Sequence, residues 1–123
     1  MPQYAALVYE PGDPDWSVID SAEKEEIMGE YGAFGATARA VIRGGAALYP
    51  ATTATNVQVK GGKGGEVVTT DGPFAETKEV LTGFYLMECA DLDEVIGWAA
   101  QIPAAWYNRV EIRPVIDLGD PAS

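Results

Sequence analysis

The amino-acid sequence predicts a single α+β domain, with an antiparallel sheet and two helices on one face of that sheet. Its 123 residues suit one domain. Segments typical of strands and helices follow in the order strand, long helix, hairpin strands, strand, helix, strand. A folded chain of this size buries about two thirds of its unfolded surface, which is enough for a core without disulfides or a structural metal.

Residues 3–10 form the first expected strand. The run is apolar at successive positions, a pattern typical of a central strand covered on both faces. Proline and glycine in residues 11–15 then predict a loop.

The first helix is expected to begin at Asp20 or Ser21 and to stop at Gly44-Gly45. Asp20 and Glu23 have the spacing of a capping box. Between the two ends, apolar side chains recur at helical spacing and form one stripe: Ile27, Met28, Tyr31, Phe34, Ala38, Val41 and Ile42.

Two β-branched runs, residues 55–60 and 66–70, flank five residues that are mostly glycine and predict a hairpin with a mobile tip. The tip lacks the Gly-x4-Gly-Lys-Ser/Thr pattern and a following helix, so no phosphate loop is predicted. Residues 81–89 are expected to form the next strand. Asp91 and Glu94 cap a second helix that Pro103 ends.

Residues 110–116 alternate as a last strand, and residues 117–123 are expected to be a loose tail of the single domain 1–123. The order of elements indicates a ferredoxin-like sandwich, in which helices cover one face of an antiparallel sheet. The other face needs a cover, and a second copy packed face to face would supply it.

The chain has no histidine and one cysteine, Cys89. The lack of histidine excludes Ser-His-Asp and Cys-His catalysis and ordinary zinc sites. Cys89 lies in an apolar run and is expected to be a buried, inert thiol. No Asp-x-Asp-x-Asp cluster supports an all-oxygen metal site, so neither a metal nor another cofactor is predicted.

A net charge of −11 makes nucleic acid and anionic membranes poor partners. The first residues lack the pattern of a signal peptide, and no apolar stretch approaches the roughly 20 residues that cross a bilayer. A cytoplasmic protein is therefore expected.

The segment from Thr69 to Glu79 is the first candidate site. It could be a rigid corner whose carboxylates cap backbone amides. It could also be a strand-end loop that closes a cleft, with Asp71 or Glu76 as base or ligand acceptor and with Phe74 and Lys78 as binding residues.

The second candidate site is the last strand, where Glu111 and Arg113 share the face opposite Val110 and Ile112. Arg113 could clamp a substrate carboxylate, or it could pair structurally with Asp71 or Glu111. Three tyrosines could donate hydrogen bonds in a pocket or serve as core aromatics: Tyr4, Tyr31 and Tyr85.

The run Asp71-Gly-Pro-Phe-Ala-Glu-Thr-Lys-Glu79, followed by Leu81-Thr-Gly-Phe-Tyr85, resembles the signature of the DGPF-domain branch of the YCII-related family. The similarity extends over residues 4–115. The resemblance implies a dimeric ferredoxin-like fold (a dimeric α+β barrel) and a cleft that the motif helps to line. Some relatives are fused to, or encoded near, extracytoplasmic-function sigma factors.

The chain departs from the enzyme-like members of that family at two positions. Their histidine on the first helix is replaced by Tyr31 or Gly32, and their aspartate after the second helix by Ile102-Pro103. A further carboxylate that many DGPF members carry is replaced by Ala46. The resemblance therefore implies no histidine–aspartate mechanism here.

Three functions are compatible with these observations. The first is a homodimeric protein that binds a small molecule and performs acid–base chemistry, with Asp71 as base, Arg113 as anion clamp, and Glu76 and Tyr31 in support. The second is an interaction module that docks on a regulatory protein such as a sigma factor. The third, by analogy of fold alone, is a cofactor-independent oxygenase of the dimeric α+β barrel type.

Overall fold

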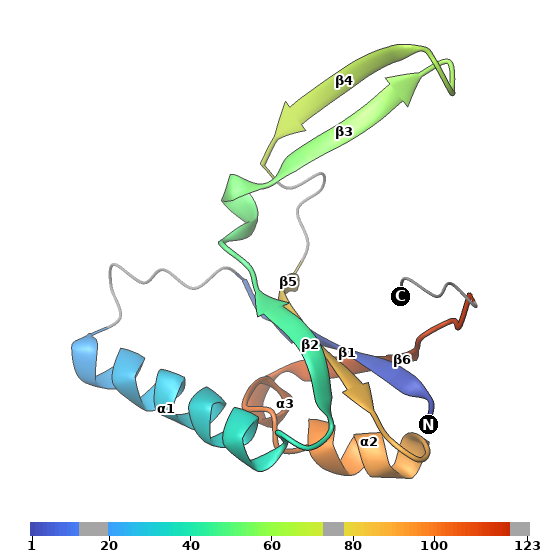
Figure 1. Ribbon diagram of the computed structural model, residues 1–123. Helices are drawn as coiled ribbons and strands as arrows, with labels where there is room; N and C mark the ends of the chain where they lie inside the picture. The colour runs from blue at the N-terminus through green and yellow to red at the C-terminus, as the bar shows by residue number, and fades with distance from the viewer. Residues whose placement is uncertain (13–19, 73–77, 119–123) are drawn as a thin grey trace.

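The structure, a computed structural model, describes residues 1–12, 20–72 and 78–118. Helices lie on one side of a four-stranded antiparallel sheet, and a two-stranded hairpin projects away from it (Figure 1). The predicted α+β class is confirmed. In the part of the chain that is described, no helix is long and apolar enough to cross a membrane.

The sheet has the strand order β2-β5-β1-β6, and all its neighbours are antiparallel. These strands are β1 (Gln3–Glu10), β2 (Ile42–Ala47), β5 (Val80–Glu88) and β6 (Arg109–Pro114). The order is that of a ferredoxin-like sandwich. As predicted, β1 is central, since it lies between β5 and β6.

Alternation along β1 separates the two faces of the sheet. Tyr4, Ala6 and Val8 are buried under the helices, whereas Ala5 and Leu7 are only half-buried. Within one chain, β1 is therefore covered on one face rather than two. We call the other side the open sheet face. The buried core consists of Tyr4, Ala6, Val8, Phe34, Ala38, Met87, Cys89, Val95, Ala99, Ile102 and Ala104.

Helix α1 (Ser21–Thr37) begins where the capping box predicts, because the Asp20 carboxylate accepts a hydrogen bond from the Glu23 N–H at 2.8 Å. It ends earlier than predicted, and Ile42 opens β2 instead of extending the apolar stripe. The glycine pair that looked like a helix stop belongs to this strand. Gly45 has φ 152°, and a Cβ there would lie 2.4 Å from the Phe84 carbonyl oxygen, so the pair permits close approach to β5.

The predicted hairpin forms, but it does not join the main sheet. Strands β3 (Thr55–Lys60) and β4 (Glu66–Asp71) pair only with each other, after the short 3₁₀ helix η1 (Ala51–Thr53). The hairpin cannot pair with β5, because β1 and β2 already occupy both edges of that strand. Positive φ angles at Gly61, Gly62 and Gly64 confirm the turn at its tip.

The second half of the chain follows its local signals closely. The Asp91 carboxylate accepts from the Glu94 N–H at 2.9 Å and caps α2 (Leu92–Ala99). A further one-turn helix, α3 (Ala104–Tyr107), follows Pro103 and was not predicted. Cys89 is fully buried, as expected.

Candidate functional site

A cavity of about 940 Å³ lies between α1 and the sheet. Its volume is within the range of sites for small ligands. Strands β1, β2 and β5 form one wall, α1 forms the other, and α3 contributes Tyr107. The lining residues are Val8, Glu10, Glu23, Glu26, Ile27, Met28, Glu30, Tyr31, Gly45, Ala46, Ala47, Leu48, Pro50, Thr82, Gly83, Phe84, Tyr85 and Tyr107.

Three polar side chains meet at one end of this cavity. The hydroxyl groups of Tyr31 on α1 and Tyr107 on α3 both donate to Oε1 of Glu10, each across 3.4 Å. Glu10 ends β1 and is in phase with the buried side chains of that strand. Three elements that are distant in the sequence thus build one group, which we call the Glu10–tyrosine cluster.

Burial raises the pKa of Glu10 above its ordinary value, and the hydrogen bonds from the two tyrosines lower it by less. Burial is also the main reason why the pKa values of Tyr31 and Tyr107 are raised, and the nearby charge of Glu10 adds to it. Both phenols therefore stay protonated near neutral pH and act as hydrogen-bond donors. Such a carboxyl group at a cavity wall has the properties of a general base or acid.

The Glu10–tyrosine cluster should cost stability at neutral pH. Between the unfolded pKa of about 4.5 and the higher folded pKa, Glu10 holds a proton more often in the folded chain than in the unfolded chain. The free energy of unfolding therefore falls as pH rises through this range. Glu10→Gln keeps an oxygen for both tyrosines but cannot ionise. We expect it to raise the thermal midpoint at pH 7 and to have little effect at pH 4. Glu25→Gln, an exposed change on α1, is the control, and an equal gain there would contradict the prediction.

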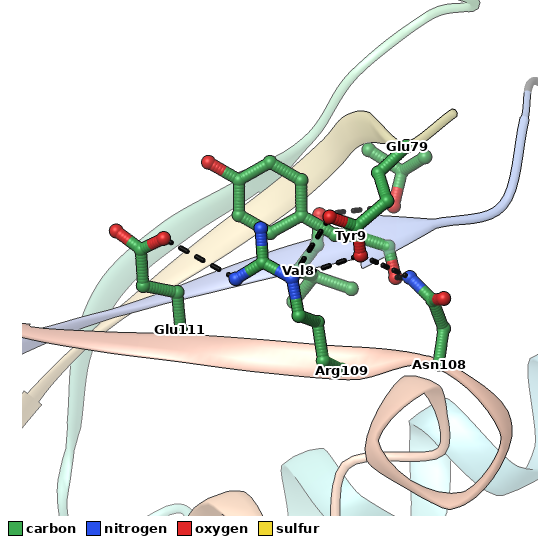
Figure 2. Close-up of polar contacts among 7 residues, drawn as sticks. Val8, Tyr9, Glu79, Asn108, Arg109 and Glu111 are labelled. Carbon is green, nitrogen blue, oxygen red and sulfur yellow. Dashed lines mark hydrogen bonds and ion pairs between the residues drawn. The ribbon is translucent and has the colours of Figure 1, made fainter. Parts of the chain in front are cut away.

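A second polar group lies at the end of the sheet where β1 ends and β5 and β6 begin (Figure 2). Arg109 Nε donates to both carboxylate oxygens of Glu79, at 2.9 and 2.8 Å, and its guanidinium lies 4.3 Å from the Tyr9 ring centroid. Asn108 Nδ2 donates to Glu79 at 3.1 Å and to the Tyr9 carbonyl at 2.8 Å. We call this group the Glu79–Arg109 clamp. These contacts hold Glu79, the residue before β5, against the end of β1 and the start of β6.

The predicted polar residues Asp71, Lys78, Glu111 and Arg113 lie outside the cavity lining. Asp71 ends β4 on the separate hairpin and is exposed, as is Lys78 just before β5. Arg113 is on β6, where its Nε lies 3.9 Å from Glu111, and Glu111 also accepts from Arg109 at 3.3 Å. The described contacts do not bring Asp71 and Arg113 together. Phe74 and Glu76 fall outside the described residues.

The predicted tyrosines divide between core and cavity. Tyr4 is buried in the core, whereas Tyr31 and Tyr85 line the cavity. Tyr85 also packs edge-on against Phe34, with ring centroids 5.2 Å apart. Sequence reasoning missed Glu10 and Tyr107. Alternation along β1 could have placed Glu10 on the same face as the buried side chains. The four residues of α3 are too few to give a helical pattern, so Tyr107 could not be identified in this way.

Comparisons with known proteins give one family and one relative. The family model described as the YCII-related domain matches residues 22–119. The chain is 37% identical over 119 residues to an uncharacterized protein of Rhizobium meliloti (strain 1021). The matched region covers 91% of this chain and 90% of that protein. Among the described residues, no group of three acidic or cysteine side chains is arranged to hold a metal ion.

Proposed function

Because this chain belongs to the YCII-related domain family, we propose that it is a small-molecule-binding protein whose ligand occupies the cavity between α1 and the sheet. We assign it to the DGPF-domain branch, on the run from Asp71 to Glu79. The observation that carries the proposal is the Glu10–tyrosine cluster. A carboxyl group with a raised pKa stands at the wall of a cavity of ligand size.

The cluster supports acid–base chemistry without metal or histidine. Both tyrosine hydrogen bonds go to Oε1 of Glu10, so neither occupies Oε2. In the proposed reaction Oε2 takes a proton from the bound molecule, while the tyrosines hold the carboxylate in place. Tyr31 thereby keeps the supporting role that its position on the first helix suggested.

We further propose that the protein is a homodimer formed through the open sheet face. The register places Ala5 beside Leu86 and Leu7 beside Phe84 on that face, which gives it an apolar centre. The chain exposes 8544 Å². A compact monomer of this mass should expose only about 6,400 Å². The difference exceeds the roughly 800 Å² that each partner buries in a standard interface, and the projecting hairpin accounts for part of it.

A thermal-shift screen of the purified protein against metabolites tests the binding site. A ligand at about 100 times its dissociation constant adds about 2.7 kcal/mol, enough to move the midpoint by several degrees. We expect the shift to be lost in Glu10→Gln and reduced in Tyr31→Phe. The control Glu66→Gln lies on the hairpin and should keep the full shift.

The same screen distinguishes this site from the one built on Asp71 and Arg113. A hit that survives Glu10→Gln but disappears in Asp71→Ala or Arg113→Ala would move the site to the motif and β6. Both variants should keep the ligand response if the cavity is the site.

One observation favours docking on a regulatory protein as a second function. Val59 pairs with Val67 and Val57 with Thr69, so three valines share one face of the projecting hairpin, and all three are exposed. Such an apolar surface is typical of a contact with another protein. Under this function the metabolite screen stays silent and the chain co-elutes with a purified sigma factor.

A further inference from the structure

The cavity is acidic, and no basic residue is among the described residues of its wall. Four of its lining residues are glutamates: Glu10, Glu23, Glu26 and Glu30. None of the chain's eight lysines and arginines is among the lining residues. The spacing of the three glutamates on α1 places them along one side of that helix, next to Ile27 and Tyr31.

Two arginines are paired away from this wall, and Lys24 on α1, although next to Glu23 in the sequence, lies outside the cavity lining. Arg43 pairs with Glu88 at 3.1 Å near the end of β5. Arg109 pairs with Glu79 at 2.8 Å beside the open sheet face. The lining therefore has a net negative charge, and water screens this charge less at the half-buried Glu10 and Glu30 than at the exposed Glu23 and Glu26.

The rest of the wall is apolar and aromatic. Val8, Ile27 and Leu48 line it together with the rings of Tyr31 and Tyr85. An aromatic face attracts a cation electrostatically, and a carboxylate binds it directly. The four carboxylates would repel an anionic ligand, whereas a hydrocarbon body would find apolar surface to cover.

We propose that the cavity binds an organic amine in its ammonium form, attached to an apolar body. The ammonium group lies against Glu10 and the α1 carboxylates, and the body lies against the strands. This inference rests on the proposed function, because it names the ligand class of the same cavity.

Three probes of nearly the same shape but different charge test the class: 2-phenylethylammonium, 2-phenylethanol and phenylacetate. Their dissociation constants are measured by titration calorimetry on the full chain. We expect the ammonium probe to bind about tenfold more tightly than the alcohol, and phenylacetate to bind most weakly. Binding of the ammonium probe should weaken as salt is added.

Matched variants locate the binding charge. Glu10→Gln should weaken the ammonium probe about tenfold or more, because it removes a charged partner from a half-buried position. Glu26→Gln should weaken it about two- to fivefold, as for a more exposed ion pair. Glu25→Gln has the same charge change on the same helix but outside the cavity lining, and it should leave the affinity unchanged.

Two results would overturn the inference, and they differ in what else they overturn. If the alcohol or phenylacetate binds the cavity as tightly as the ammonium probe, the ligand class is wrong while the proposed site stands. If none of the three probes gives saturable binding and the metabolite screen is also silent, the proposed function fails with the inference.

Discussion

Met87→Ala is expected to lower the unfolding free energy by about 2–5 kcal/mol, the usual cost of truncating a large buried side chain. Met87 is fully buried on β5, on the face that the helices cover. Urea denaturation at fixed protein concentration measures the loss. Met28→Ala is the matched control, because Met28 is 69% exposed on α1 and its truncation should cost less than about 0.5 kcal/mol.

Leu86→Ala, one residue away, tests the opposite face of the same strand. The register places Leu86 on the open sheet face beside Ala5, where we propose that the second copy packs. We expect this variant to shift the monomer–dimer equilibrium toward monomer in sedimentation, while Met87→Ala acts on the fold itself. A wild-type protein that stays monomeric at every concentration would contradict the proposed dimer. If Met87→Ala lowers the unfolding free energy by less than about 1 kcal/mol, the assignment of Met87 to the buried face is wrong.

The elements predicted correctly are those specified by neighbouring residues. Asp20 and Asp91 cap their helices because a short side chain reaches a backbone N–H three residues ahead. The hairpin of β3 and β4 forms because glycines at its tip adopt positive φ. The position of that hairpin outside the main sheet is not local information, since it depends on which strand pairs with β5.

Strand β2 shows where pattern reasoning was wrong and why. Its sequence, Ile-Arg-Gly-Gly-Ala-Ala, has one β-branched residue, and it follows an apolar stripe of helical spacing. Pairing with β5 makes it a strand, and that pairing is a tertiary effect. The same glycines can end a helix or admit a neighbouring backbone, and only the fold decides between these uses.

The candidate site was predictable only in part for a similar reason. Tyr31 was identified from the stripe on the first helix, and it does line the cavity. Its partners Glu10 and Tyr107 come from the end of β1 and from a one-turn helix, 97 residues apart. Asp71 was predicted because it belongs to a motif that is continuous in sequence, residues 71–79. The cavity instead combines residues from separate segments, which only folding brings together.

Gly45→Ala is expected to lower the unfolding free energy by about 2 kcal/mol or more. A φ of 152° is strained for alanine, and the new Cβ would lie 2.4 Å from the Phe84 carbonyl oxygen and 3.1 Å from the Tyr85 Cα. Relief requires β2 to move away from β5. Because Gly45 and Ala46 line the cavity, that movement should also weaken the binding of any ligand that the metabolite screen identifies.

Gly44→Ala is the matched control for this prediction. It adds the same methyl group one residue earlier, where the nearest atom is Leu86 Cδ1 at an ordinary 3.6 Å and φ is not positive. Its unfolding free energy in urea should stay within about 1 kcal/mol of the wild-type value. Equal losses in the two variants would mean that close approach of β2 to β5 is not what requires glycine at position 45.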